Sequence, residues 1–345
     1  MPQVSTPLAL LTGSIYAFSK FAPLHLRQPA LDLLTPHLSD KALSRLLLLC
    51  ASTFAITTVA KSILGVSSWF SRNSENNWVE DKYDWDSELV LITGASSGFG
   101  EKIAAKLATG GTKVVTVDKN GLGPQLQTCK RMVQYKSVTI TSGYPADILE
   151  IDKNVHHYQV DITDWEALGS AVEQIKVEHG DPTVLILNAG ICHKIPILNK
   201  DFSKIRTLID INLTSHFAML QHFLPAMVKN NHGHIMSLGS LSSYIPIPGA
   251  ADYSATKSGL CALHEALRLE LRHIYKANKV RTSLVHPLWT HTPLIKDFEP
   301  DLKELGLPTL QLDETIDPIV GQLYSGYGGT LIVPNYLGFA TGIRG

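Results

Sequence analysis

Tyr253 and Lys257 are the pair of residues in this sequence with the clearest capacity for chemistry. Residues four positions apart share one face of a helix, so the lysine ammonium group is expected near the tyrosine phenol. A free tyrosine has a pKa near 10 and is a poor base at neutral pH, but a cation at roughly 4 Å can lower that pKa by up to about three units. The pair therefore predicts a site in which a tyrosine takes the proton of a substrate hydroxyl group.

The spacing of a tyrosine and a lysine is weak evidence by itself, because Tyr16 and Tyr275 are also followed by a lysine at the fourth position. Only Tyr253 has a serine, Ser240, thirteen residues upstream and at the end of a predicted strand. A serine hydroxyl there can hydrogen-bond the substrate oxygen. Ser240, Tyr253 and Lys257 are therefore predicted to act together.

An apolar run over residues 89–93 breaks into a turn with three glycines and then opens a helical pattern. A backbone can approach a pyrophosphate closely only where side chains are missing, and a helix N-terminus offers free N–H groups and a partial positive charge. The turn therefore predicts the phosphate grip of a dinucleotide-binding fold, and a glycine-rich turn that binds nothing is the alternative. The residues expected in this grip are Gly94, Ser96, Ser97, Gly98, Phe99 and Gly100.

Asp118 ends the second predicted strand, twenty-four residues after Gly94. A carboxylate at that place can accept hydrogen bonds from an adenosine ribose, and it would repel a 2′-phosphate. No arginine or lysine occupies residues 95–97, and Lys119 alone is a weak phosphate site. We therefore expect NAD as the cofactor, with NADP as the alternative.

The elements that must position these residues alternate between strand and helix from about residue 85 onward. Short apolar strands separated by helices predict a parallel sheet covered on both faces. Residues 134–154 have no clear periodicity and are expected to form a surface insertion. Strands are expected at 89–93, 113–117, 155–160, 184–188, 234–238, 280–285 and 330–333, and helices at 165–178, 202–229, 253–277 and from 98 to the glycine pair 110–111.

The first seventy residues differ in character from the rest. Residues 46–60 carry no charge, and a helix over 43–64 would reach about 33 Å, enough to cross a bilayer if Arg45 and Lys61 extend toward opposite interfaces. A shallow hairpin with the apolar stretch 7–19, an interfacial helix, and a helix packed on the catalytic domain are the alternatives. The expected organisation is a hydrophobic membrane-associating segment over 1–70, a polar linker over 71–86 and a catalytic domain over 87–345.

Composition excludes some classes of function. The formal net charge is −1, from 30 basic and 31 acidic residues, so nothing favours nucleic-acid binding. The four cysteines are far apart without a C-x-x-C pair, which argues against a disulfide framework and for a reducing compartment. The 14 histidines form no metal-ligand pattern, so no metal is expected.

Further motifs occur in a fixed order along the catalytic segment. Asp161 follows the third predicted strand, Asn188-Ala189-Gly190 follows the fourth, and Asn212 lies on the long predicted helix. With the glycine turn and the tyrosine–lysine pair, they make residues 87–345 resemble the short-chain dehydrogenase/reductase family. One departure is visible, because the family usually has Pro-Gly after the sixth strand and here Pro287 is followed by leucine.

The resemblance implies a single Rossmann-type α/β domain with a doubly wound parallel sheet, here with an N-terminal hydrophobic helical extension. It implies that Asn212 holds a water linking Lys257 to solvent, that Lys257 also binds the nicotinamide ribose, and that Asp161 contacts the adenine. Asn212 thus joins Ser240, Tyr253 and Lys257 as a catalytic residue. The resemblance adds Asp161, Ile162, Asn188, Ala189, Gly190, Pro287, Thr290 and Thr292 to the expected cofactor-binding residues, together with Tyr253 and Lys257.

The apolar N-terminal segment followed by Trp85-Asp86-Ser87-Glu88 resembles the membrane-associated retinol and 17β-hydroxysteroid dehydrogenase group. This narrower resemblance implies a lipophilic alcohol or carbonyl substrate and a location at the endoplasmic reticulum or lipid droplet, with the catalytic domain facing the cytosol. Apolar residues over 294–310 are expected to form a lid. An NADPH-dependent reductase of a small soluble substrate and a silent dinucleotide-binding scaffold are the alternatives. A homodimer is left open.

Overall fold

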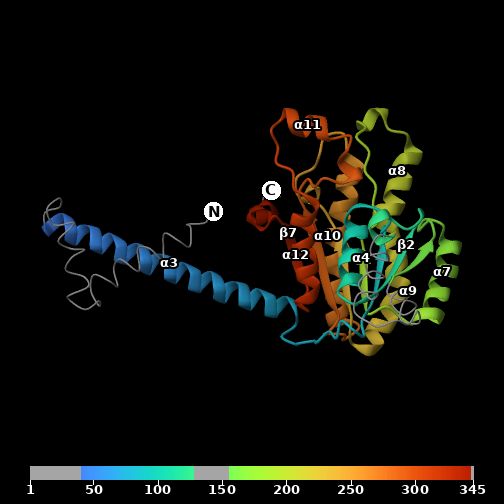
Figure 1. The fold of residues 1–345 in the computed structure, drawn as a ribbon, viewed down its shortest axis with the longest axis horizontal. Coiled ribbons are helices and arrows are strands. Elements are labelled where there is room, and N and C mark those ends of the chain that lie inside the picture. The colour runs from blue at the N-terminus through green and yellow to red at the C-terminus, as the bar shows by residue number, and fades with distance from the viewer. Residues whose placement is uncertain (1–39, 128–154, 343–345) are drawn as a thin grey trace, which may run out of the picture. The chain divides into compact units, whose positions relative to one another are not determined.

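The computed structural model describes residues 40–127 and 155–342. Within them, the strands form one parallel seven-stranded sheet in the order β3-β2-β1-β4-β5-β6-β7 (Figure 1). The order reverses between β1 and β4, and open parallel sheets bind ligands outside the carboxyl ends of their strands at such a point. The expected doubly wound sheet is confirmed. Its strands are β1 (Leu89–Thr93), β2 (Lys113–Asp118), β3 (Val155–Gln159), β4 (Val184–Leu187), β5 (His234–Leu238), β6 (Arg281–Pro287) and β7 (Gly329–Val333).

Helices cover both faces of the sheet (Figure 1). They are α4 (Gly98–Thr109), α7 (Trp165–His179), α8 (Phe202–Ile209), α9 (Ser215–Asn230), α10 (Ala251–His273), α11 (Glu299–Glu304) and α12 (Leu312–Tyr324). Successive side chains of a strand point to opposite faces. Leu89 and Leu91 of β1 belong to one apolar core with α7, α9 and α10, whereas Val90 and Ile92 belong to another with α4 and α12. The central strands are therefore apolar on both faces, as the sequence predicts.

The predicted strand bounds agree with the observed ones to within two residues. The helix expected over 202–229 is interrupted, because a π-helical turn, Asp210–Thr214, separates α8 from α9. Such turns often occur at functional sites, and this one carries the buried Asn212. The insertion expected over 134–154 lies outside the described residues.

The structure contains helix α12, which is not predicted from the sequence. Pro318 lies inside it, and a proline predicts against a helix interior. The helix nevertheless buries Ile316, Ile319, Val320 and Leu323, whose spacing places them on one face against α4. Packing on the sheet therefore outweighs the local penalty of the proline.

Residues 76–88, here called the lead-in segment, pack on the amino ends of β5, β6 and β7. The Asn76 side chain donates to the carbonyl of Gly328 at 3.1 Å and accepts from its N–H at 2.7 Å. The guanidinium of Arg281, which is 2% exposed, donates to the carbonyls of Asn76 and Val79. This part of the expected linker therefore has fixed partners in the catalytic domain, and residues 71–75 belong to a helix.

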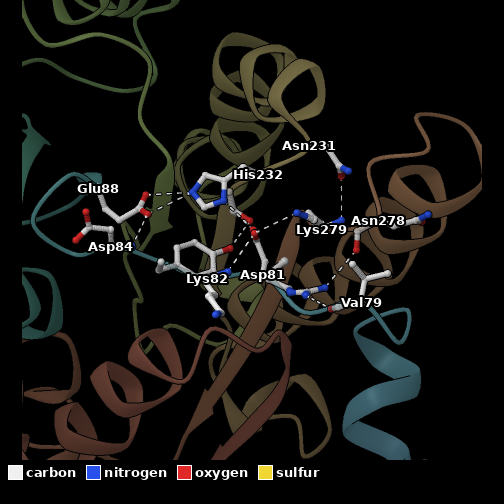
Figure 2. A network of polar contacts seen from close by, with 12 residues as sticks. Val79, Asp81, Lys82, Asp84, Glu88, Asn231, His232, Asn278 and Lys279 are labelled. Carbon is white, nitrogen blue, oxygen red and sulfur yellow. Dashed lines mark hydrogen bonds and ion pairs between the residues drawn. The ribbon is translucent and has the colours of Figure 1, made fainter.

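A histidine and two carboxylates tie the lead-in segment to the turn before β5 (Figure 2). His232 Nδ1 lies 2.7 Å from Asp81 Oδ2, and His232 Nε2 lies 3.3 Å from Glu88 Oε2. Both carboxylates are at least nine-tenths buried, while the imidazole is partly exposed. The Tyr83 hydroxyl donates to the carbonyl of Gly233 at 2.9 Å. These hydrogen bonds hold the segment beside the sheet.

Helix α3 (Asp40–Glu75) contains the apolar stretch 43–64. Among the described residues, no helix is both long enough and apolar enough to cross a membrane. The apolar stretch 7–19 lies outside the described residues. Large apolar side chains of α3 that are exposed are Leu48, Leu49, Phe54, Ile56, Val59, Ile63, Val66, Trp69 and Phe70.

Candidate active site

A cavity of about 430 Å³ lies at the carboxyl ends of β1, β2 and β4, a volume typical of small-molecule sites. It brings most of the predicted residues together: Gly94, Ser97, Gly98, Phe99, Asp118, Asp161, Ile162, Asn188, Ala189, Gly190, Tyr253, Lys257, Pro287 and Thr292 all line it. The predicted residues Ser96, Gly100, Asn212, Ser240 and Thr290 do not line it. Each of these has a different place in the structure.

The glycine turn has the backbone that a phosphate grip requires. Gly94 and Gly98 have φ angles of +69° and +60°, which favour glycine. A Cβ on Gly94 would lie 2.6 Å from Ala189 Cα, and one on Gly100 would lie 2.3 Å from the Gly94 carbonyl oxygen. Helix α4 begins at Gly98 without a side-chain cap, so its first N–H groups remain for a ligand at the cavity. The turn therefore fits the pyrophosphate of a dinucleotide.

Asp118 holds the glycine turn as well as facing the cavity. Its Oδ2 accepts from the Ser96 N–H and its Oδ1 from the Asn120 N–H, both at 2.9 Å. A carboxylate has about four acceptor sites, so both oxygens can still accept from a ribose hydroxyl group. Ser96 also donates through Oγ to the Asn120 carbonyl at 3.1 Å. Ser96 thus shapes the grip from outside the cavity.

Asp161 is fixed by the turn that follows β3. Its Oδ1 accepts from the N–H and the hydroxyl of Thr163, at 2.9 and 2.8 Å. The backbone hydrogen bond from Thr163 is the main reason that the pKa of Asp161 lies below its usual value. Asp161 and Ile162 therefore present an ionised carboxylate and an apolar side chain at one end of the cavity.

Tyr253 and Lys257 lie in the first turns of α10, and both are almost fully buried. The ammonium nitrogen of Lys257 is 5.6 Å from the centroid of the Tyr253 ring. It donates to the carbonyl of Leu238, the last residue of β5, at 2.5 Å. Ser240 follows that strand, and its Oγ accepts from the Ser242 N–H at 3.1 Å, which leaves the hydroxyl proton available to another acceptor.

Burial governs the acid–base state of this pair. It raises the pKa of Tyr253 above its usual value, while the hydrogen bond with Ser240 acts in the opposite direction. Burial also lowers the pKa of Lys257 to about 8. The sequence predicts that Lys257 lowers the pKa of Tyr253, but here its ammonium group is bonded to Leu238 and the serine is the group that favours the phenolate.

The side chains of Asn212 and Lys257 both lie close to Gly190. A Cβ on Gly190 would lie 3.5 Å from Asn212 Oδ1 and 3.8 Å from Lys257 Nζ. The amide of Asn212 accepts from the N–H of Ile191 at 2.8 Å and donates to its carbonyl at 2.9 Å. Asn212 thus fixes the backbone that follows Asn188-Ala189-Gly190, which is the floor of the cavity.

After β6, Thr290 does not lie where a cofactor-binding residue is expected. Thr290 is buried, and its hydroxyl bonds the carbonyl of Leu288 at 3.0 Å and the Thr315 hydroxyl of α12 at 2.9 Å. Thr292 lines the cavity. The leucine that stands where the family has glycine donates its N–H to the Val333 carbonyl at 2.8 Å and packs beside Leu241 and Ile332. The backbone hydrogen bond does not depend on the side chain, so what the leucine adds is apolar packing beside β7.

The side of the cavity next to Tyr253 is apolar. Tyr253 shares an apolar cluster with Leu208, Ile295, Phe298 and Leu302, so part of the stretch expected to form a lid packs over the catalytic helix. Leu294, from the stretch expected to form a lid, also lines the cavity, as do Cys192 and His193, which were not among the predicted residues. Cys192 and His193 lie two and three residues after the Asn188-Ala189-Gly190 motif, and this position could have identified them from the sequence.

This site combines a dinucleotide-type phosphate grip with a half-buried serine and a buried tyrosine and lysine. That combination defines a class of nucleotide-dependent oxidoreductases. The family model described as short chain dehydrogenase matches residues 88–303. The chain belongs to this family and is an oxidoreductase that uses a nicotinamide dinucleotide, as its sequence predicts.

Named relatives support a narrower group within the family. Dehydrogenase RED2 of Cochliobolus heterostrophus is 36% identical over 236 residues, which cover 68% of this chain and 80% of that protein. Estradiol 17-beta-dehydrogenase 11 of Rattus norvegicus is 30% identical over 235 residues, covering 68% of this chain and 71% of that protein. The resemblance to the 17β-hydroxysteroid dehydrogenase group is thereby confirmed.

Solved structures share the fold. A short-chain dehydrogenase from Sphingobium yanoikuyae in complex with NADPH has a TM-score of 0.60 at 22% identity and covers 74% of this chain and 91% of that chain. A 3-ketoacyl-(acyl-carrier-protein) reductase from Brucella melitensis with NADH has a TM-score of 0.56 at 24% identity, covering 72% of this chain and 98% of that chain. One of these two proteins is in complex with NADPH and the other with NADH, so they do not distinguish the cofactors.

Proposed function

We propose that this protein interconverts a lipophilic alcohol, of the retinoid, steroid or long-chain type, and its carbonyl compound. The observation that carries the proposal is the position of Tyr253 at the boundary between the dinucleotide cavity and an apolar cluster that includes Phe298 and Leu302. An apolar wall beside the proton-transferring phenol suits a substrate whose hydroxyl group is its main polar feature. The name of the rat relative, an estradiol dehydrogenase, supports a substrate of this kind.

In the oxidative direction, a nicotinamide dinucleotide held by the glycine turn and Asp118 would supply the acceptor for the hydride that leaves the alcohol carbon. The Tyr253 phenolate accepts the proton of the same alcohol, so the carbon–hydrogen and oxygen–hydrogen bonds break as the carbonyl forms. Ser240 donates a hydrogen bond to the substrate oxygen. Lys257 lies beside the Tyr253 ring and donates to the Leu238 carbonyl, and Asn212 holds the backbone of Ile191.

Asp118 supports NAD as the preferred dinucleotide. Its carboxylate faces the cavity next to the glycine turn, where a ribose 2′-hydroxyl could donate to it and a 2′-phosphate would be repelled. Lys119 and Asn120 also line this end of the cavity. A single lysine beside an aspartate is a weak binding site for a phosphate.

The exposed apolar side chains of α3 support association with a membrane surface, because large exposed apolar areas are unfavourable in water. We place the protein at the endoplasmic reticulum or lipid droplet with the catalytic domain facing the cytosol. There, a lipophilic substrate would reach the site from the membrane. A homodimer is compatible with this arrangement.

The experiment is a turnover screen of retinoids, steroids and long-chain alcohols with NAD and with NADP, using the full chain in detergent. Tyr253→Phe is the control, and it should lose about 100-fold or more of the turnover while dinucleotide binding persists. Near-wild-type turnover in that variant would contradict the catalytic assignment. Turnover only of small soluble carbonyl compounds with NADPH would favour the alternative substrate class.

A further inference from the structure

The loop that carries Ser240 is anchored at both of its ends. At its far end, the Ser243 hydroxyl donates to the Lys257 carbonyl and the Ser258 hydroxyl donates to the Ser243 carbonyl, both at 2.9 Å. These two bonds join the loop to α10, the helix that carries Tyr253. At its near end, the loop leaves β5 through Gly239, and a residue of the neighbouring strand holds it there.

That residue is His286, the second-to-last residue of β6, which is fully buried. Its Nδ1 is 2.8 Å from the carbonyl oxygen of Ser240. A Cβ on Gly239 would lie 3.0 Å from this imidazole and 2.9 Å from the Val285 carbonyl oxygen, so the ring packs directly against the glycine backbone. The imidazole and the loop are therefore in contact both by hydrogen bonding and by packing.

The chemistry of the contacts fixes the protonation of His286. A carbonyl oxygen only accepts, so Nδ1 must carry the hydrogen. The Tyr244 hydroxyl lies 3.4 Å from Nε2 and can donate to it. Burial lowers the pKa of His286 to about 4; the hydrogen bond with the Ser240 carbonyl acts in the opposite direction, and the nearby Lys257 lowers the pKa further. His286 is therefore a neutral Nδ1–H donor over the ordinary pH range.

We propose that His286 is a positioning residue for Ser240: its Nδ1–H fixes the Ser240 carbonyl and thereby aims the serine hydroxyl at the Tyr253 phenol and the substrate oxygen. The inference rests on the proposed catalytic role of Ser240. Ser240 itself favours the phenolate of Tyr253, as its effect on the pKa of that residue indicates. A displacement of about 1 Å at a reacting site can cost 100-fold in rate, so an anchor on the serine backbone affects the reaction.

Two substitutions of similar polarity test whether the hydrogen bond from Nδ1 to the Ser240 carbonyl matters, or only the presence of a buried polar side chain at position 286. In His286→Asn, the side-chain amide can place an N–H close to the position of Nδ1, whereas in His286→Gln it reaches the position of Nε2. We expect His286→Gln to lower kcat by about 10- to 100-fold with an unchanged Kd for the dinucleotide, and His286→Asn to retain most of the kcat. In a pH profile of kcat, the limb that reports Tyr253 should move to higher pH in His286→Gln and in Ser240→Ala alike.

A double-mutant cycle tests whether His286 acts through Ser240. In the Ser240→Ala background, His286→Gln should have no further effect on kcat, because the hydroxyl that it positions is gone. Nitrogen-15 NMR of labelled histidine in the full chain should identify the Nδ1–H tautomer of His286 without any substrate. His234→Gln is the matched control: it also removes a buried histidine bonded to a serine hydroxyl, but at the amino end of β5, and it should leave the pH profile unchanged.

The outcomes distinguish this inference from the proposed function. Three outcomes would each overturn the positioning role while Ser240 remains catalytic. The first is that the losses of kcat in His286→Gln and Ser240→Ala multiply in the double variant. The others are equal activity of His286→Asn and His286→Gln, and an Nε2–H tautomer of His286. Wild-type turnover in Ser240→Ala would instead refute the catalytic role of the serine, and the positioning role would fail with it.

Discussion

The carboxylate of Asp118 faces the cavity and also accepts hydrogen bonds from two backbone N–H groups that shape the glycine turn. Removing it would therefore change both the electrostatics of ribose recognition and the local backbone. The first effect distinguishes NAD from NADP, whereas the second weakens both dinucleotides. A substitution that keeps the size of the side chain is needed to separate them.

We predict that Asp118→Ala weakens NAD binding and narrows the difference in affinity between NAD and NADP, since the variant loses a ribose acceptor and a charge that repels a 2′-phosphate. Dissociation constants for both dinucleotides provide the measurement. Asp118→Asn serves as the control, because it removes the charge and preserves the side-chain volume. If the wild-type chain already binds NADP more tightly than NAD, the interpretation of Asp118 is wrong.

Buried neutral histidines predict a loss of stability in acid. Burial lowers the pKa of His234 to about 3, whereas an unfolded chain has the ordinary value of about 6.5. Between these values the unfolded state binds a proton that the folded state does not, so stability falls as the pH drops below about 6.5. We expect His234→Gln to reduce the slope of unfolding free energy against pH by about 1.4 kcal/mol per unit in this window, as measured by urea unfolding. An unchanged slope would contradict the neutral state of His234.

At the scale of elements, the lead-in segment belongs to the catalytic domain. Arg281 is buried at the start of β6, and its guanidinium donates to carbonyls of Asn76, Val79 and Asn278. A chain that lacks residues 76–84 would leave most of these donors without acceptors in a buried place. Breaking the contacts of a buried charge by removing one side typically costs about 3 to 5 kcal/mol.

We therefore predict that the chain truncated to begin at Ser74 folds, whereas the chain truncated to begin at Trp85 is destabilised by several kcal/mol, roughly the cost of a buried unpaired charge. Unfolding midpoints of the two forms provide the test. Arg281→Met in the shorter form should recover part of the loss, because it removes the buried charge. Equal midpoints for the two truncated chains would mean that the lead-in segment contributes no stability.

At the scale of the whole molecule, the exposed apolar side chains of α3 and the cofactor site belong to separate parts of the sequence. All residues that line the cavity come after Leu89. We predict that deleting residues 1–73 moves the protein from the membrane fraction to the soluble fraction, while dinucleotide binding persists. Turnover of a lipophilic alcohol supplied in vesicles should fall more than turnover of the same alcohol in detergent. Fractionation and dinucleotide titration measure both effects, and a full chain that is soluble without detergent would contradict the membrane proposal.

The sequence by itself determined the parallel sheet and most of the cavity, because their signals are local. The apolar run before the glycine turn became β1 with the expected bounds, and Gly94 and Gly98 adopt the positive φ angles that their type allows. The order of Asp118, Asn188 and Tyr253 along the chain also predicted where each would lie, because each follows a strand or begins a helix at the same edge of the sheet.

Only the tertiary structure decided features that depend on partners far apart in the chain. Asn76 meets Gly328 across 252 residues, and His286 meets Ser240 across 46, so neither contact has a signature at either residue alone. Helix α12 forms despite Pro318 because the sheet offers it an apolar face. The direction in which the pKa of Tyr253 moves was likewise beyond the sequence, since burial is set by every element that packs around a group, and a spacing of four residues contains no information about it.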